Sequence, residues 1–244
     1  ALCRGGWPEA VLESDPEIAL DQAKDYVAEL LDSDIDEMDD KKRNSTWLRA
    51  ILRSYARNIS TEASQATIAA DMGGEPPSEN TVADYLDALR RTYVTEDLPA
   101  WNPALRSKTA VRTSPTRHFC DPSIGAALLG ASPRKLLLDF STFGLFFESL
   151  CVRDLRGTVY HYRDKTGLEA DAVVVLDDGR WGAVEVKLGE KQVEEGAAHL
   201  LKLASRVDDS KEGAPSFLMV LTGQQAAYCR PDGVYVVPIT CLAP

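Results

Sequence analysis

Hydrophobic residues in the first half of the chain recur at intervals of three and four positions, the spacing of an amphipathic helix. These intervals predict helices over residues 16–33, 47–55, 64–73 and 79–92. The last two, a short and a longer helix separated by a glycine-containing turn, form a helix-turn-helix pattern. Such a pattern serves either DNA binding or packing alone, and Asp84 and Asp87 on the longer helix weaken the DNA-binding interpretation.

The second half of the chain alternates helical and strand-like patterns. Runs rich in β-branched residues and bounded by glycine, proline or aspartate predict strands between the helices. In order, we expect a helix at 143–156, strands at 159–163, 169–176 and 180–187, a helix at 192–205, and strands at 216–221 and 233–237. The predicted fold class is α+β or α/β, a helical N-terminal region followed by an α-β-β-β-α-β domain.

Residues 93–130, between the two halves, are short β-like pieces separated by prolines, and they would form a wing after the helix-turn-helix. Within this region a basic stretch, residues 103–117, contains four basic residues and no acid: Arg106, Lys108, Arg112 and Arg117. Basic side chains without acidic neighbours suit contacts with the phosphates of a nucleic acid. The alternative is a solvated loop without a ligand.

A turn signal at residues 177–179 joins two of the predicted strands into a hairpin. Antiparallel pairing across this turn places Asp171 opposite Glu185 and Glu169 opposite Lys187. Because side chains alternate along a strand, all four charged residues lie on one face. The other positions of the hairpin are mostly apolar on both faces, so we expect the sheet to be covered on both sides.

The carboxylates of Asp171 and Glu185 are therefore expected to lie close together and partly out of water. Two such carboxylates repel each other, and one pKa rises unless a cation lies between them. Lys187 offers one cation, and Mg²⁺ or Mn²⁺, which prefer oxygen ligands, offers a stronger one. The alternative is an ordinary ion pair between Glu169 and Lys187. Glu148, the one acid in an apolar helical stretch upstream, favours the metal site.

A glutamate on a first helix, then an aspartate, then Glu-x-Lys on a hairpin resembles the PD-(D/E)xK nuclease superfamily. The resemblance implies a restriction-endonuclease-like fold and a metal held by Glu148, Asp171 and Glu185. It also implies that Lys187 positions the attacking water, so that Asp171, Glu185 and Lys187 are the catalytic residues. Two further residues would have supporting roles, Glu169 and Gln192. The chain departs from the superfamily pattern in having Glu-Ala-Asp where Pro-Asp is usual.

Composition restricts the class of protein further. The 244 residues carry a formal net charge of −11 and a pI of about 4.8, which is not typical of a protein that coats nucleic acid. Thirteen acids and five bases lie in residues 1–45, far from the hairpin in sequence. The five scattered cysteines indicate reduced thiols in a cytoplasmic protein. No apolar run approaches ~18 residues and no signal peptide is present, so we expect no membrane partner.

Several motifs along the chain support a second resemblance: Gly5–Ala10, the helix-turn-helix with its wing, His118–Gly130, Gly167–Asp171 and Val184–Lys187. Together they are similar to a prokaryotic family of uncharacterised domains found C-terminal to an AAA+ ATPase module. The resemblance implies three regions: a connector from the ATPase module at 1–43, a winged-helix-like domain at 44–130 and a nuclease-like domain at 131–244. ATP would bind in the ATPase module alone, because this sequence lacks a Gly-x-x-x-x-Gly-Lys-Ser/Thr loop.

Three functions remain open from the sequence. The first is a Mg²⁺- or Mn²⁺-dependent endo- or exodeoxyribonuclease that hydrolyses phosphodiesters. The second is a non-catalytic adaptor that binds DNA or protein and is coupled to the ATPase. The third is a toxin–antitoxin or defence regulator. Nucleic acid and the ATPase module are the expected partners, and a homo-oligomer is left open.

Overall fold

The computed structural model describes residues 1–32, 44–74, 76–103, 114–207 and 212–242. It is a mixed α/β protein that divides into two compact units. The N-terminal unit comprises Ala1–Asp97 and Thr116–Ser149, and the sheet unit comprises Leu98–Pro115 and Leu150–Pro244. The predicted division at residue 130 differs from this one, because the chain passes between the units three times.

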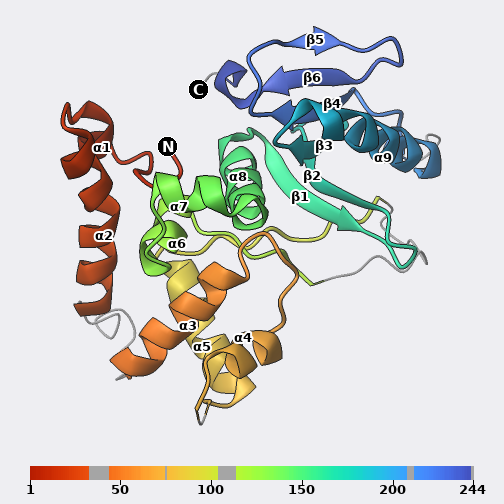
Figure 1. Ribbon diagram of the computed structural model, residues 1–244. Coiled ribbons are helices and arrows are strands. Elements are labelled where there is room, and N and C mark those ends of the chain that lie inside the picture. The colour runs from red at the N-terminus through yellow and green to blue at the C-terminus, as the bar shows by residue number, and fades with distance from the viewer. Residues whose placement is uncertain (33–43, 75, 104–113, 208–211, 243–244) are drawn as a thin grey trace. The chain divides into compact units, whose positions relative to one another are not determined.

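The described part of the N-terminal unit is built from helices (Figure 1). They are α1 (Pro8–Leu12), α2 (Pro16–Asp32), α3 (Ser45–Arg57), α4 (Gln65–Asp71), α5 (Glu79–Arg91), α6 (Pro122–Leu128), α7 (Pro133–Leu138) and most of α8 (Phe140–Asp154). Side-chain oxygens of Asn44, Ser64 and Ser78 accept backbone N–H groups at the starts of α3, α4 and α5. These caps satisfy donors that the first turn of a helix leaves free, which explains where the three helices begin.

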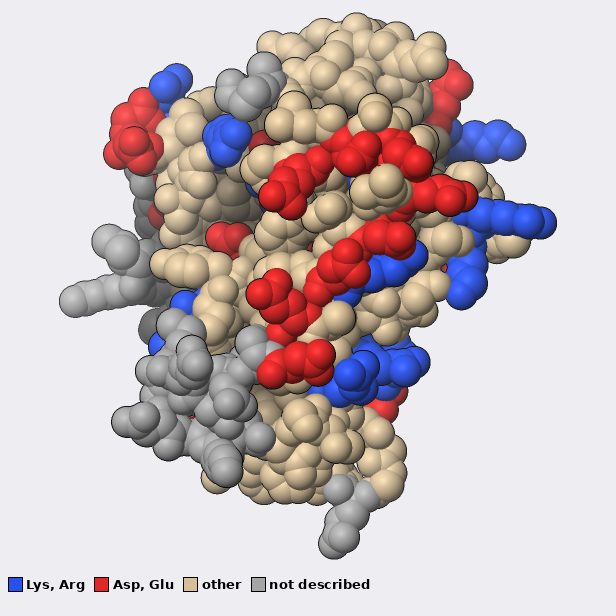
Figure 2. Space-filling model, turned by 90° about the vertical axis from the view of Figure 1, so that its left-hand side faces the viewer, with Lys and Arg blue, Asp and Glu red and all other residues tan. Residues whose placement is uncertain are grey.

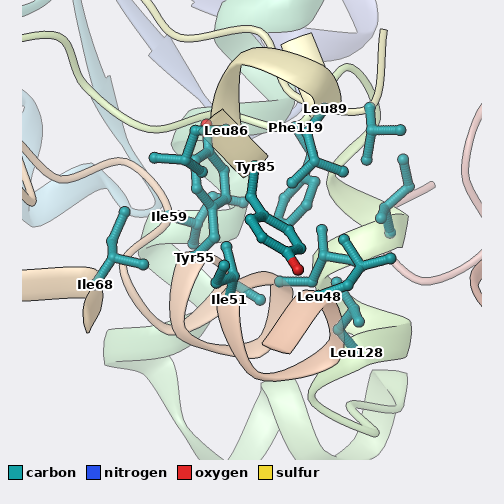
Figure 3. Close-up of a cluster of buried hydrophobic side chains, with 14 of the residues drawn as sticks. Leu48, Ile51, Tyr55, Ile59, Ile68, Tyr85, Leu86, Leu89, Phe119 and Leu128 are labelled. Carbon is teal, nitrogen blue, oxygen red and sulfur yellow. The ribbon is translucent and has the colours of Figure 1, made fainter. Parts of the chain in front are cut away.

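Helices from both ends of the N-terminal unit contribute to one hydrophobic core (Figure 3). Tyr55 of α3 and Phe119 lie edge to face, with ring centroids 4.9 Å apart, and both rings are buried. Ile51, Leu89 and Leu128 bring α3, α5 and α6 to the same core. The segment after residue 115 is therefore part of this unit although it follows α5 by more than twenty residues.

The wing predicted after α5 is not formed by strands in the described residues. A single antiparallel bridge joins Thr95 to Phe119, and the Glu96 N–H donates to the His118 carbonyl at 2.8 Å. The intervening chain leaves the N-terminal unit at Leu98, because apolar residues that follow are buried in the sheet unit. The helices of the helix-turn-helix pattern are present, and a winged-helix fold is not confirmed.

The sheet unit contains a mixed six-stranded sheet in the order β1-β2-β3-β4-β6-β5. Its strands are β1 (Thr158–Arg163), β2 (Glu169–Val175), β3 (Trp181–Lys187), β4 (Phe217–Thr222), β5 (Tyr228–Cys229) and β6 (Tyr235–Pro238). The β1–β2 and β2–β3 pairs are antiparallel, whereas β3, β4 and β6 run parallel. Helix α9 (Val193–Arg206) connects β3 to β4 and packs on the sheet (Figure 1). The predicted order of elements from α8 to β4 is confirmed.

A segment from the middle of the chain completes the core of the sheet unit. The Trp101 N–H donates to the His161 carbonyl at 2.7 Å, and the His161 N–H donates to the Pro99 carbonyl at 2.9 Å. The Trp101 ring lies 4.7 Å from that of Trp181 and 6.2 Å from that of Tyr162, and all three are buried. Residues 98–101, here called the strap, thus belong to the sheet unit by both backbone and side-chain contacts.

The acidic side chains of α1 and α2 lie mostly on the exposed sides of these helices. Figure 2 shows acidic side chains gathered on the side of the molecule that carries these helices. The exposed acids of the two helices include Glu9, Glu17, Asp21, Asp25 and Glu29. None of the helices in the described part of the chain is long and apolar enough to cross a membrane.

Candidate functional site

The β2–β3 hairpin forms with the predicted register. The Leu176 N–H donates to the Arg180 carbonyl at 2.8 Å, and Gly179 adopts a φ of +82° in the turn between them. A positive φ favours glycine, which has no Cβ to clash with the backbone. Residues 172–175 of β2 then pair in order with residues 184–181 of β3.

The ladder between β2 and β3 ends at Ala172 and Val184, just before the predicted site. Beyond this pair, the Val186 N–H donates to the Asp171 carboxylate at 2.7 Å. A carboxylate oxygen here accepts a strand N–H, the role that a backbone carbonyl plays in a regular ladder. The Asp171 side chain is thereby fixed against β3.

Glu185 lies one residue before Val186 and is almost completely buried, with 1% of its side chain exposed. Its Oε2 atom lies 2.7 Å from Nζ of Lys187. Its Oε1 atom is buried without a hydrogen-bond partner among the described residues, and His199 Nδ1 lies 3.8 Å from it. A separation of 3.8 Å is too long for a hydrogen bond, so one oxygen of a buried carboxylate is unsatisfied.

The electrostatics of the three groups follow from burial and from their mutual charges. Burial raises the pKa of Asp171, while the Lys187 charge opposes the rise. Burial and then the Asp171 charge raise the pKa of Glu185, again against the effect of Lys187. Burial alone would lower the pKa of Lys187, but the charges of Asp171 and Glu185 outweigh it and raise the pKa. The prediction that repulsion between the two carboxylates raises one pKa is supported for Glu185.

Helix α9 packs against the face of the hairpin that carries Glu185 and Lys187, and Gly196 lies at this contact. A Cβ atom added at Gly196 would lie 3.3 Å from Cε of Lys187 and 3.4 Å from Cβ of Glu185. Such contacts are tighter than ordinary van der Waals distances. The absence of a side chain at Gly196 therefore lets the helix backbone approach Glu185 and Lys187 closely, and His199 follows one turn later on the same helix.

Sequence reasoning missed Gly196 and His199. The signal that could have found them is the helical period of α9, in which positions three apart lie on the same face. Gly196 faces the sheet as Ala197 and Leu200 do, and His199 lies beside Leu200 at the edge of that face. A histidine at the edge of an apolar helix face, on a helix that follows the hairpin, could have been recognised as a candidate residue of the site.

The other residues predicted for the site lie in different surroundings. Glu169 is exposed and pairs with Arg163 of β1, whose Nε lies 3.5 Å from Glu169 Oε2. Lys187 is paired with Glu185, so the alternative of a Glu169–Lys187 ion pair is not what the structure shows. Gln192 is exposed at the start of α9 and makes no capping hydrogen bond through its side chain.

Glu148 lies on α8 among the residues of the N-terminal unit and is half-buried. The Phe146 and Phe147 side chains that precede it are buried, as the apolar pattern of this helix predicted. The contribution of Glu148 to a metal site stays a prediction.

Of the four basic residues predicted to contact phosphate, the structure describes Arg117. Arg106, Lys108 and Arg112 lie outside the described residues. Arg117 is buried, its guanidinium forms an ion pair with Asp97, and its Nε donates to the Ala63 carbonyl at 2.9 Å. These contacts hold the Arg117 side chain inside the N-terminal unit, which is not the placement that a phosphate contact requires.

The donor groups at the hairpin fit a hard divalent cation. Within the described ranges, no group of three or more His, Cys, Asp and Glu side chains is arranged to hold a metal ion. Mg²⁺ in proteins is commonly bound through one or two carboxylates, with water and substrate phosphates as its other ligands. Asp171 and Glu185 supply such a pair, and the unsatisfied Oε1 of Glu185 is an oxygen that a cation would satisfy.

Two family models match the chain, one in each half. Residues 143–242, which include the hairpin, match the domain of unknown function DUF4143, which is typically found C-terminal to AAA-type ATPase domains. The hairpin with its charged residues therefore lies in a mixed α/β region that is similar to this domain. Residues 1–135 match the domain of unknown function DUF8612, and the chain belongs to this family. Searches of curated proteins and of solved structures gave no match.

Proposed function

We propose that the sheet unit is a metal-dependent nuclease of the restriction-endonuclease-like class that hydrolyses phosphodiester bonds in DNA. The observation that carries the proposal is the meeting of Asp171, Glu185 and Lys187 at one end of the hairpin, with Oε1 of Glu185 buried and unsatisfied. A buried carboxylate oxygen without a partner costs free energy, so a fold that keeps one is expected to use it.

In this proposal Asp171 and Glu185 hold Mg²⁺ or Mn²⁺. The ion, when bound, would polarise a phosphoryl oxygen and lower the pKa of a water molecule. Lys187 orients the attacking water and stabilises negative charge near the phosphate, since its raised pKa keeps it an ammonium. Burial of Glu185 and the hydrogen bond from Val186 to Asp171 fix both carboxylates before substrate arrives.

The proposed nuclease works as one part of a larger assembly. DUF4143 domains typically follow AAA-type ATPase domains, so we propose that an ATPase module delivers or remodels the nucleic acid that the sheet unit cuts. The acidic surface of α1 and α2 is unsuited to contact with nucleic acid.

The test is cleavage of supercoiled plasmid and of branched DNA by the purified chain in the presence of Mg²⁺ or Mn²⁺. We expect cleavage by the wild type, and at least about a 100-fold loss of activity in Lys187→Ala and in Asp171→Asn, because each change removes a group that acts on the transition state. Lys165→Ala is the matched control, since Lys165 is an exposed lysine in the loop between β1 and β2.

Circular dichroism would verify that each variant remains folded. Equal cleavage by wild type and Lys187→Ala, or no cleavage by the wild type with either ion, would rule out the nuclease. A chain that binds DNA without cutting it, and whose binding is unchanged in Asp171→Asn, would instead be the non-catalytic adaptor.

A further inference from the structure

Two surfaces of the N-terminal unit expose large apolar side chains beside charges of opposite sign. We propose that these two surfaces bind each other between copies of this chain, so that the protein associates head to tail. The inference is independent of the proposed nuclease, because neither surface includes a residue of the hairpin and neither belongs to the sheet unit.

The first surface, here called the acidic face, is formed by α1 and the first turn of α2. Three large apolar side chains are exposed there: Val11, Leu12 and Ile18. Residues 9–23 contain five acids and no Lys or Arg, and the exposed acids are Glu9, Asp15, Glu17 and Asp21. Figure 2 shows acidic side chains gathered on the side of the molecule that carries these helices. This face therefore combines apolar side chains with negative charge.

The second surface, here called the basic face, lies where α7 ends and α8 begins. Three large apolar side chains are exposed there as well: Leu137, Leu138 and Phe140. Arg134 and Lys135 are exposed on the same short helix. The one acid among residues 133–140 is Asp139, and its carboxylate accepts hydrogen bonds from the N–H and the hydroxyl of Thr142, at 3.1 and 2.7 Å. The Asp139 charge is thus engaged at the start of α8, and the basic charges remain.

Folding of the N-terminal unit does not account for these exposed side chains. Helix α7 buries Leu136 in the core, and the two leucines that follow it are exposed. Helix α1 buries Ala10, and the two apolar residues that follow it are exposed. A surface helix ordinarily presents polar residues to water. One exposed leucine needs no explanation, but several large apolar side chains close together on a surface are typical of a site that binds another protein.

The charges of the two faces determine which faces meet. Contact of the acidic face with the same face of a second copy would oppose like charges, whereas contact with the basic face opposes unlike charges and buries apolar side chains on both sides. Figure 1 shows α1 at one end of α2 and apart from α7, so the two faces are separate surfaces of the unit. The contact is therefore heterologous, and it continues from copy to copy as a ring or a filament.

The size of the faces limits how tightly the copies bind. A stable protein–protein interface buries about 800 Å² on each partner, and three large apolar side chains on each face supply only a part of that area. We therefore expect weak association, with a dissociation constant of roughly 10–100 µM.

The experiment is analytical ultracentrifugation of the whole chain from about 1 to about 300 µM, a range that spans the expected dissociation constant. The mean mass of the wild type should rise with concentration. Leu12→Lys places a positive charge against the basic face and Leu138→Asp a negative charge against the acidic face, so each variant alone should associate at least about 10-fold more weakly. Tyr93→Ser removes an exposed ring outside both faces and should associate as the wild type does. All three positions are exposed, and circular dichroism would verify that the variants are folded.

An equimolar mixture of Leu12→Lys and Leu138→Asp tests the head-to-tail arrangement directly. Each variant keeps one intact face, and the two intact faces are unlike, so the mixture should form a dimer and nothing larger. A mixture that stays monomeric while the wild type associates would mean that each face meets its own copy, which overturns the inference.

Association that persists undiminished in either variant alone also overturns it. A wild type that is monomeric at every concentration overturns it as well, and would leave both faces to a different partner, such as an ATPase module. DNA cleavage is not measured here, so none of these outcomes bears on the proposed nuclease.

Discussion

Tyr93 has a backbone conformation that glycine usually takes at the end of a helix. Its φ is +57°, and it follows Thr92, the C-cap residue of α5. The Val94 N–H donates to the Leu89 carbonyl at 2.9 Å and the Tyr93 N–H to the Arg90 carbonyl at 3.1 Å, the two hydrogen bonds of a helix-ending Schellman motif. The side chain is 82% exposed, so no burial offsets the strain of the left-handed backbone.

Tyr93→Gly is therefore expected to stabilise the protein. The gain in the free energy of unfolding should be about 0.5–1 kcal/mol, because relief of strain exceeds the added entropy of glycine in the unfolded chain. Urea unfolding followed by circular dichroism measures it. Tyr93→Ala keeps the left-handed strain and serves as the control, and a loss of stability in Tyr93→Gly would show that the exposed ring is needed.

The raised pKa of Glu185 predicts how stability depends on pH. Burial first, and then the Asp171 charge, raise this pKa from an ordinary value of 4.5 to about 8. The folded protein thus binds a proton more tightly than the unfolded chain does, and the stabilising effect is complete below about pH 4.5 and lost as pH rises through about 8.

We expect the wild type to lose roughly 2 kcal/mol or more of unfolding free energy between about pH 5 and about pH 8, relative to the Glu185→Gln variant. The amide of that variant does not titrate, so the difference between the two unfolding curves isolates Glu185. A difference that stays constant over this range, or one that grows with pH, would contradict the prediction. Addition of Mn²⁺ should restore stability at the higher pH, because the ion binds the charged carboxylate.

At the scale of elements, α9 determines the geometry of the site through Gly196. A methyl group at this position would meet Lys187 and Glu185 at 3.3–3.4 Å, so their side chains would have to shift. Alanine also stabilises a helix by about 1 kcal/mol relative to glycine, which offsets the crowding.

For Gly196→Ala we therefore expect a midpoint of thermal unfolding close to that of the wild type, together with a loss of activity. Displacement of Lys187 should lower DNA cleavage by roughly 10-fold, since misplacement by about 1 Å can reduce a rate 100-fold. Ala198→Gly, an exposed change on the same helix, is the control for altered propensity. Full activity in Gly196→Ala would show that the close approach of α9 has no role in catalysis.

Elements that depend on local sequence were predictable. The β2–β3 register followed from alternation and from the turn, and α4 and α5 followed from apolar spacing and from the glycine-containing turn between them. The pairing of Asp171 with the Val186 N–H was not, because period-two alternation carries no information on where a ladder ends. The two-residue strand β5 is too short for any periodicity to appear.

Contacts between distant parts of the chain account for most of what the sequence did not predict. Arg117 was expected to face solvent with other basic residues, but its partner Asp97 lies twenty residues earlier and becomes its neighbour only in the fold. Trp101 likewise belongs to a core formed largely by residues after 158. Neither contact has a signature in local composition, and the domain boundary placed at residue 130 falls inside Thr116–Ser149, a segment of the N-terminal unit.

At the scale of the whole molecule, the strap is expected to stabilise the sheet unit through Trp101. Trp101 is 6% exposed and lies against Trp181 and Tyr162. Trp101→Ala should lower the stability of the sheet unit by about 3–5 kcal/mol, the usual cost of removing a large buried ring.

Urea unfolding measures this loss of stability. Hydrogen–deuterium exchange of the backbone amides of β1 and β3 should be faster in Trp101→Ala than in the wild type. Tyr228→Ala, which removes an exposed ring from β5, should change stability by less than about 1 kcal/mol and is the control. Unchanged exchange in Trp101→Ala would mean that the sheet unit folds without the strap.

The same strap sets an order of events during synthesis. A ribosome releases residues 98–101 well before it has made β1 and β3, the strands that receive Trp101. Nascent chains fold mostly from the N-terminus, so this indole stays exposed to solvent while the helices that precede it in the chain fold. Docking of Trp101 against Trp181 would then be a late step, which completes the core of the sheet unit only after β3 has been synthesised.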